Sequence, residues 1–225
     1  MKSLFVVAVV CLGVLGFSGH SSSLDVDLAG LKEAFLSSNV GLEPFTAAHL
    51  SRTRRNDEDI EEKSCCGHFN REMAKKMPTL QMECYNSMIN RKFECDKSKE
   101  EIQIKYCADE CICKKQNACD GKGNVKPEDF KKICQNYFMQ KELNDVIKPL
   151  CDHVGSEANA HAKGLAEEEG LKSCNLAPGM AFNLIHYVAV ANCPDKYLNK
   201  SKGCMELKKY IQQTTKKQQQ ESNRH

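Results

Sequence analysis

The sequence contains no tryptophan, and it has no long apolar run beyond the one near its N-terminus. A helix that crosses a bilayer needs about 20 consecutive apolar residues, so the sequence predicts no membrane span. An excess of one charge is also missing, because 32 Lys and Arg residues stand against 30 Asp and Glu residues, for a formal net charge of +2. A near-neutral chain gives no support for a nucleic-acid partner. We therefore expect neither a membrane nor a nucleic acid among the partners.

Catalytic signatures are missing as well. The sequence has no Gly-x-Ser-x-Gly and no His-Glu-x-x-His, the motifs of serine hydrolases and zinc proteases. The stretch SCCGHF is similar to the Cys-Cys-x-x-His of secreted phospholipases A2, but His68 stands one place too early and Arg71 replaces a further cysteine. The cysteines between Cys107 and Cys119 are dense enough for zinc, but a secreted route favours disulfides. We expect no enzyme, no metal and no cofactor.

The stretch ACDGKGNVKPEDF resembles half of a calcium-binding loop. Such a loop needs oxygen donors at its first, third and fifth positions and a carboxylate at its twelfth. The residues at these positions are Ala118, Asp120, Lys122 and Asp129, so two donors are missing and a positive charge is present. We interpret the stretch as a turn between two helices, the second of which begins at Pro127, and as a hinge in the wall of a hydrophobic cavity.

The ends of the chain differ from its middle. A basic start, a short apolar run and small residues predict a secretory signal peptide over residues 1–21, and therefore secretion to the extracellular space. Residues 22–64 contain no cysteine and are typical of an exposed arm, in which the basic cluster ending at Arg55 fits the pattern cut by proprotein convertases. Residues 214–225 are polar and predicted to be disordered. The folded domain is then residues 65–213.

Apolar residues in this domain recur with the period of a helix. After Pro127 they fall at i, i+3, i+4, i+7 and i+8, and these positions are Phe130, Ile133, Cys134, Tyr137 and Phe138. A second stripe includes Pro149, which should kink or shorten its helix. From Met180 to Ala191 nearly every position except Asn183 and His186 is apolar, which is typical of a helix buried among others. No two-residue alternation predicts strands, so the class is all-α, with six or seven helices.

Cysteine is abundant. Of the 14 cysteines, Cys11 lies in the predicted signal peptide, which leaves the odd number of thirteen. So many cysteines in a small secreted chain predict a disulfide framework. Cys107 and Cys111 are four residues apart in a predicted helix and therefore share one side of it. Two bonds from that side can tie the helix to two separate segments.

The cysteine spacing, with the motifs SCC, CADEC, CNLAPGM and NCPDKYLNKSKGC, resembles the Plus-C subclass of insect odorant-binding proteins. The resemblance covers residues 65–213 and leaves the arm before them unexplained. It implies a compact, disulfide-rich helical bundle around a hydrophobic cavity. The resemblance implies two disulfides, Cys84–Cys111 and Cys151–Cys193. We add Cys174–Cys204 as a guess for a third. The partners of Cys65, Cys66 and Cys95 stay open.

One position departs from the family pattern. Leu184 occupies the place of the fifth conserved cysteine, so Cys107 loses the partner that the resemblance implies. Cys107 is then free, bonded to a second molecule, or paired with a nearby cysteine such as Cys113 or Cys119, and we favour this local rewiring. The same substitution would explain the odd number of cysteines.

The resemblance implies a secreted carrier for odorants, pheromones or other lipophilic molecules in an insect secretion. Its partners would be a small hydrophobic molecule and either an olfactory receptor or a second copy of the chain. The candidate cavity-lining residues are Met88, Phe130, Ile133, Phe138, Met180, Leu184 and Val188, each of which could equally be ordinary core. Asn199 begins a glycosylation sequon. The alternative is a secreted structural or interaction protein with a filled cavity, as a monomer or a disulfide-linked dimer.

Overall fold

The computed structural model describes residues 64–222, with side chains up to residue 213. The predicted signal peptide, the arm up to residue 63 and Arg55 lie outside the described residues. Within them the chain forms seven α-helices and one short 3₁₀-helix, and its only β pairing is three isolated bridges. The helices are α4 (Arg71–Ile89), η1 (Lys97–Lys99), α5 (Glu100–Lys115), α6 (Pro127–Gln135), α7 (Lys141–Cys151), α8 (Val154–Glu169), α9 (Ala177–Ala191) and α10 (Lys202–Ser222). The predicted all-α class is confirmed.

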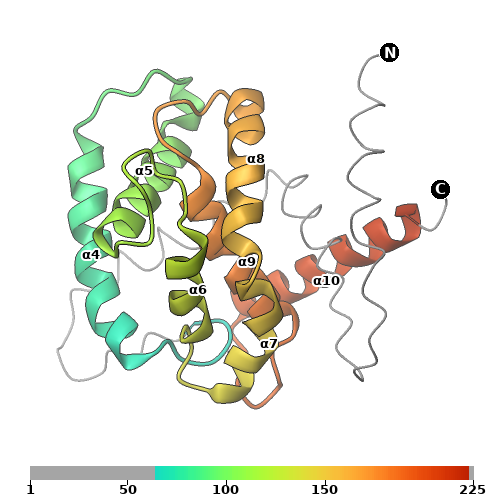
Figure 1. Ribbon diagram of the computed structural model, residues 1–225. Coiled ribbons are helices and arrows are strands. Elements are labelled where there is room, and N and C mark those ends of the chain that lie inside the picture. The colour runs from blue at the N-terminus through green and yellow to red at the C-terminus, as the bar shows by residue number, and fades with distance from the viewer. Residues whose placement is uncertain (1–63, 223–225) are drawn as a thin grey trace.

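Helix α9 lies at the centre of the bundle. It packs against α5, α7, α8 and α10, while α4 lies beside α5 at one flank and α6 lies in front (Figure 1). Ten of its residues between Ala177 and Val190 are buried. This burial on several sides explains why its sequence is apolar nearly all round.

Local signals set several helix ends. Asn70 caps α4, because its side chain accepts a hydrogen bond from the Glu72 N–H. Pro127 is the first residue of α6, as the sequence predicts. Pro149 lies in the last turn of α7, which ends two residues later at Cys151. Gly170 ends α8 in the left-handed conformation at φ 68°, where a residue with a Cβ would be strained.

Six disulfides join these helices. They are Cys65–Cys204, Cys66–Cys193, Cys84–Cys111, Cys107–Cys174, Cys113–Cys119 and Cys134–Cys151. The predicted Cys84–Cys111 bond is present and ties α4 to α5. Within the described residues Cys95 is the one cysteine left without a disulfide.

The expected pairing of Cys107 is wrong. Cys107 bonds to Cys174 because the segment before α9 runs along α5. Its backbone N–H groups at Ser173 and Asn175 donate to Gln103 and Glu110 of α5. The odd number of cysteines is therefore explained by the unpaired Cys95, and not by the substitution at position 184.

The two other predicted pairings at the end of the domain are also wrong. Cys151 bonds to Cys134, since α6 and α7 pack against each other and bring them together. Cys193 and Cys204 bond to Cys66 and Cys65 respectively, because residues 66–67 lie along the loop after α9, where the Gly67 N–H donates to the Tyr197 carbonyl. The predicted bonds Cys151–Cys193 and Cys174–Cys204 are absent.

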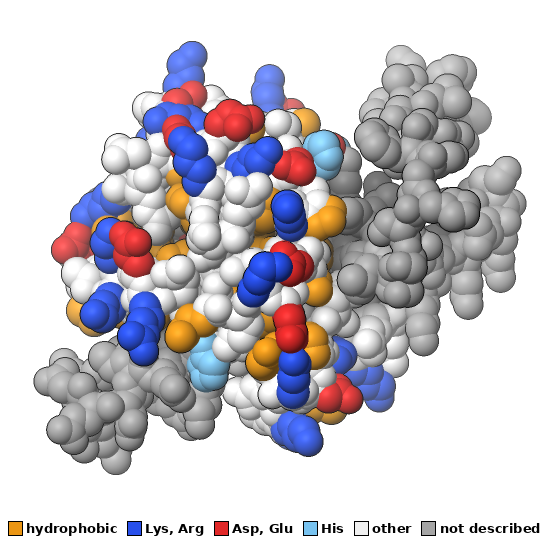
Figure 2. Space-filling view, turned by 60° about the horizontal axis from the view of Figure 1, so that its bottom comes forward, with side chains coloured by type: hydrophobic (Ala, Val, Ile, Leu, Met, Phe, Trp, Pro, Cys, Tyr) orange, Lys and Arg blue, Asp and Glu red, His pale blue; other side chains and the backbone are white. Residues whose placement is uncertain are grey.

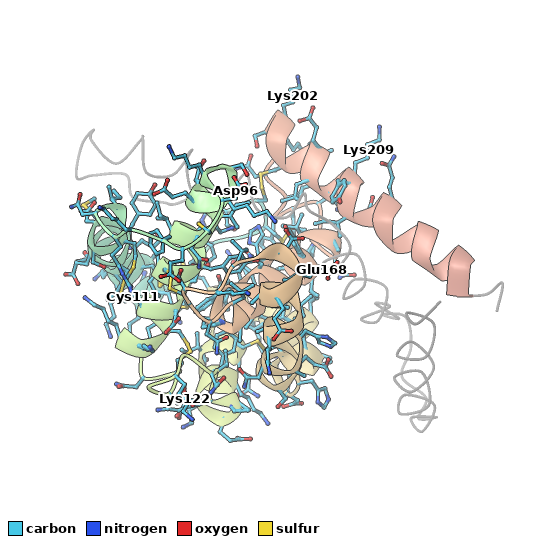
Figure 3. All side chains as sticks on the ribbon, turned by 90° about the horizontal axis from the view of Figure 1, so that it is seen from above. Asp96, Cys111, Lys122, Glu168, Lys202 and Lys209 are labelled. Carbon is cyan, nitrogen blue, oxygen red and sulfur yellow. A yellow bond between two sulfur atoms is a disulfide. The ribbon has the colours of Figure 1, made fainter. Side chains whose placement is uncertain are left out.

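Part of the predicted disordered tail is helical. The backbone of α10 continues to Ser222, past residue 214. Its first turns are anchored to the body, since Cys204 and Ile211 are buried, and Lys and Gln have good helix propensity. A helix that is already nucleated therefore extends through them. Beyond that anchor α10 projects from the bundle (Figure 1). Lys202 and Lys209, in its anchored part, point away from the body (Figure 3).

Candidate functional site

Most of the predicted cavity-lining residues belong to one hydrophobic core. Phe130, Phe138, Met180 and Val188 are buried in it, and Ile133 and Leu184 pack against its edge. The Phe130 ring meets the Phe182 ring with centroids 5.0 Å apart, which is a favourable edge-to-face distance. α6, the segment after it that carries Phe138, and α9 therefore bring six of the seven residues together. Their role as cavity lining stays a prediction.

Met88 does not join that core. It lies near the end of α4 and is half-buried, and its sulfur accepts a 3.4 Å hydrogen bond from the Arg91 guanidinium. The small core between α4 and α5 is made of other residues, including Cys84, Ala108 and Ile112. Met88 thus lies outside the core that holds the other predicted lining residues.

An open cleft of about 970 Å³ lies between α4, the end of α5 and α6. Its apolar lining is Met73, Leu80 and Ile133, of which only Ile133 was a predicted site residue. The remaining lining consists of Asn70, Glu72, Lys75, Lys76, Thr79, Lys115, Gln116, Asn117, Lys132 and Asn136. The volume lies in the range of known small-molecule pockets. The cleft is therefore large enough for a small molecule.

The rim of the cleft is basic, and acidic side chains nearby neutralise part of its positive charge. Four lysines and one glutamate line it, and three of the lysines form ion pairs: Lys76 with Glu72, Lys115 with Glu83 and Lys132 with Asp129. Figure 2 shows the same mixture on one face of the molecule, where basic and acidic side chains alternate around apolar patches. Exposed pairs of this kind contribute little to stability, so the rim lysines can exchange partners at low cost.

Hydrogen bonds to Asp120 organise the turn after α5. Asp120 Oδ1 accepts hydrogen bonds from the N–H groups of Lys122 and Asn124 at 2.8 and 2.9 Å. The Asn124 side-chain amide also donates to Asp120 Oδ2 at 3.0 Å. This bond is the largest cause of the lowered pKa of the Asp120 carboxyl, and the two backbone bonds lower it further. The carboxylate is thereby used inside an Asx turn, and Cys113–Cys119 closes the same loop. Across residues 64–213 no group of three or more His, Cys, Asp or Glu side chains is placed to hold a metal ion.

Both α5 and α9, which pack against each other, carry buried polar groups. Lys105 of α5 is only 7 % exposed, and its Nζ is buried without a hydrogen-bond partner. On α9 the Nδ2 of Asn183 is also buried without a partner. Buried polar groups are nearly always hydrogen-bonded, so each of these two unpaired donors is unusual.

Burial also shifts the titration of this interface. It lowers the pKa of the Lys105 ammonium, and it raises the pKa of the Asp109 carboxyl to about 6. Each residue partly offsets the effect of burial on the other, because their opposite charges lie one helical turn apart. Burial likewise raises the pKa of Tyr187 on α9 to about 12. The interface therefore favours neutral forms of its side chains.

Sequence reasoning missed Lys105 and Asp109. Both lie close in sequence to Cys107 and Cys111. The prediction for this segment was based on those two cysteines alone. A usable signal was present, since Lys105 stands between Ile104 and Tyr106 in the stretch IQIKYC. A lysine within such an apolar run either reaches solvent by its long side chain or becomes buried.

The described helices include none that is long and apolar enough to cross a bilayer. No family model, curated protein or solved structure matches the chain in comparisons with known proteins. The function must therefore be inferred from the residues and their geometry.

Proposed function

We propose that the protein is a secreted carrier that binds small hydrophobic molecules. The observation that supports this most directly is the cleft of about 970 Å³ between α4, α5 and α6, with apolar lining from Met73, Leu80 and Ile133. A lipophilic ligand would gain roughly 25 cal/mol for each Å² of apolar surface that it buries there. Odorants, pheromones and related volatile lipids are the ligand class that the resemblance to Plus-C odorant-binding proteins implies.

The disulfides support the secreted part of the proposal. Six disulfides hold one helical body, and frameworks of this density are typical of proteins that fold in an oxidising compartment. They also keep the helices in place when a cleft replaces part of the packed interior. The sequon at Asn199 is in the loop between α9 and α10, which is compatible with glycosylation during secretion.

A fluorescent apolar probe tests the carrier function. The mature chain should bind N-phenyl-1-naphthylamine, and a panel of lipophilic compounds should displace it. Ile133→Asp places a carboxylate in the apolar part of the cleft and should weaken probe binding by about tenfold or more. Ile89→Asp is the matched control, because Ile89 is 50 % exposed on α4 and lies outside the cleft lining. Probe fluorescence at background level with the unmodified chain would exclude a carrier.

The packed core favours a second function. Phe130, Phe138, Met180 and Val188 fill the interior as core residues, as they would in a structural or interaction protein on the same scaffold. A disulfide-linked dimer through Cys107 does not fit, since that cysteine bonds to Cys174. A dimer would have to use Cys95. Electrophoresis with and without reductant tests it, and a monomer in both would rule it out.

A further inference from the structure

The cleft between α4, α5 and α6 has a small apolar lining and a positively charged rim. Four lysines and one glutamate line it, a formal charge of +3. Even when Glu83 and Asp129 are counted, which pair with two of these lysines, a charge of +1 is left. Among the described residues Lys75 has no ion-pair partner. The cleft therefore complements an occupant that has an apolar centre and negative charges on either side of it.

The chain itself contains a segment with this pattern. Residues 56–63 read NDEDIEEK, which gives five acidic residues and one lysine, a formal charge of −4. Ile60 is the one apolar residue of the segment, with acidic residues on both sides of it. The segment lies outside the described residues and is joined directly to Ser64, the first of them.

The point where this segment joins the body lies close to the cleft. Ser64 is in a tight turn, since its hydroxyl donates to the carbonyls of Cys66 and Gly67. Asn70, three residues after Gly67, already lines the cleft. Its N–H donates to the Tyr137 carbonyl at 3.0 Å, so the start of α4 lies beside the end of α6. The segment is thus attached near the mouth of the cleft.

The segment is long enough to enter the cleft. The three residues from Gly67 to Asn70 span at most about 11 Å. Ile60 is four residues before Ser64 and can extend about 14 Å from it, and Asp57 can extend about 25 Å. A segment on so short a tether has an effective concentration of about millimolar at the cleft, so contacts that are individually weak are sufficient to hold it there.

We propose that residues 56–63 bind in the cleft, with Ile60 against its apolar lining and the acidic residues paired with its lysines. The ion pairs of the rim are exposed and exchange at low cost, so the lysines can turn to the segment. The segment begins after Arg55, and a cut at Arg55 would therefore leave it attached to the body. The docking does not require the proposed carrier function.

Carbodiimide crosslinking of the full mature chain tests the docking, because the reagent joins a carboxylate to an ammonium group where the two are in contact. Peptides that contain residues 56–63 should be joined to Lys75 of α4 and Lys132 of α6, the cleft lysines nearest to the tether. The ion pair between Lys131 and Asp152, at 2.6 Å, gives a reference yield within the same molecule.

Lys200 and Lys202 are the matched control positions. Both are exposed and lie outside the cleft lining. They are also close to the tether, since the Asn199 N–H donates to the Cys65 carbonyl at 3.1 Å. A segment that is tethered but does not bind in the cleft would react with them at least as often as with the cleft lysines.

Variants of the segment identify what holds it. Ile60→Ser keeps all five acidic residues, removes the apolar contact and should lower the yield of the cleft crosslinks at least about threefold. Ile60→Val keeps an apolar side chain and should retain them. Position 60 lies outside the described residues, so both variants leave the sequence of the helical body unchanged.

A mixture of ¹⁴N-labelled and ¹⁵N-labelled chains identifies the source of the occupant. Crosslinks within one chain should carry a single label. Crosslinks that join the two labels would assign the cleft to the segment of a second copy and overturn the docking within one chain.

The segment should also compete with a ligand of the cleft and weaken its apparent affinity without abolishing it. Replacing Asp57, Glu58 and Asp59 by the corresponding amides should tighten binding of N-phenyl-1-naphthylamine by about twofold to tenfold. Glu167→Gln combined with Glu168→Gln, at exposed positions of α8, should leave the affinity unchanged.

Three further results would overturn the docking: no crosslinks at Lys75 and Lys132, crosslinks there that are no more frequent than at Lys200 and Lys202, or a yield that is unchanged in Ile60→Ser. The crosslinks and the probe also separate this proposal from the carrier function. Cleft crosslinks in a chain that binds no probe would retain the docking and reject the carrier. Probe binding without cleft crosslinks would retain the carrier and reject the docking.

Discussion

Gly179 of α9 lies directly against Asp109 of α5, so close that a Cβ at position 179 would stand 2.7 Å from the Asp109 carboxylate. The Tyr106 ring closes the same space at 2.7 Å. The rigid ring cannot move away as the end of a flexible side chain could. Glycine is therefore required at this helix crossing for steric reasons, although its φ angle is ordinary.

The first prediction is that Gly179→Ala destabilises the fold by about 1 to 3 kcal/mol, as overpacking does. Chemical denaturation of the mature chain measures it. Gly164→Ala is the matched control, because nothing lies within 4 Å of a Cβ at that position of α8. There the better helix propensity of alanine should stabilise by up to about 1 kcal/mol. Changes of the same sign in both variants would contradict the steric argument.

The second prediction concerns pH. The pKa of Asp109 rises from 3.8 to about 6 on folding, so the native state binds more protons than the unfolded state between these values. Stability should then fall as pH rises from about 4 to 6, by about 1 to 3 kcal/mol from this group. Unfolding free energies measured across that range test it. Asp109→Asn should remove this part of the pH dependence of stability. If the pH dependence is unchanged in that variant, it arises from other groups.

The third prediction follows from the charge of Lys105, which lowers the pKa of Asp109 against the effect of burial. Lys105→Met should therefore move the Asp109 titration midpoint above 6. The ¹³Cγ chemical shift of Asp109 followed by NMR gives this midpoint directly. Lys163→Met removes an equal charge from an exposed site and should leave it in place. A midpoint that falls in Lys105→Met would show that the two groups do not interact in this way.

The fourth prediction uses two disulfides that begin at neighbouring residues. Cys65–Cys204 and Cys66–Cys193 close loops of 139 and 127 residues, but once one bond is formed the other closes a ring of only about a dozen residues. Replacing either pair by alanine should cost about 3 kcal/mol, and replacing both should cost about 7 kcal/mol because the long loop then opens. Denaturant titrations of the three variants measure this. A loss equal to the sum of the single-pair losses would mean that the bonds act independently.

The fifth prediction concerns Cys95, which is half-buried and unpaired. Burial raises the pKa of its thiol, and the nearby charges of Glu100 and Asp96 raise it further. The native mature chain should react with one equivalent of iodoacetamide. The reaction should be slower than that of Cys95 in the unfolded chain. Glu100→Gln should speed the reaction roughly twofold, whereas Glu101→Gln should not. Labelling that persists in Cys95→Ser would mean that another cysteine is reduced.

Much of the helical architecture could be predicted because its signals are local. The stripe that starts at Phe130 and the proline at position 127 predict α6, although the helix ends at Gln135 and Phe138 lies beyond it. The apolar stretch after Met180 predicts the buried α9. Periodicity, capping and proline placement act within a few residues. The turn at Asp120 was predictable for the same reason, since the hydrogen bonds that the Asp120 carboxylate accepts come from residues within four positions.

The disulfide connectivity could not be predicted in the same way. Cys107 has nearby cysteines at 113 and 119, yet its partner is 67 residues away, because the segment before α9 returns to α5. Similarly, the burial of Lys105 depends on tertiary packing and not on its own neighbours in sequence. Pairing and burial of this kind are decided by tertiary packing, which local patterns do not encode.

The bonds at Cys65 and Cys66 also set a covalent boundary. Every residue from 66 to 193 is enclosed in a ring closed by a disulfide, whereas residues 22–64 contain no cysteine. A single proteolytic cut inside the ring leaves one connected molecule that keeps its mass on a non-reducing gel. A cut at Arg55 instead releases everything before it, and the six bonds stay intact. The chain can therefore lose its N-terminal arm in one step and keep its helical body whole.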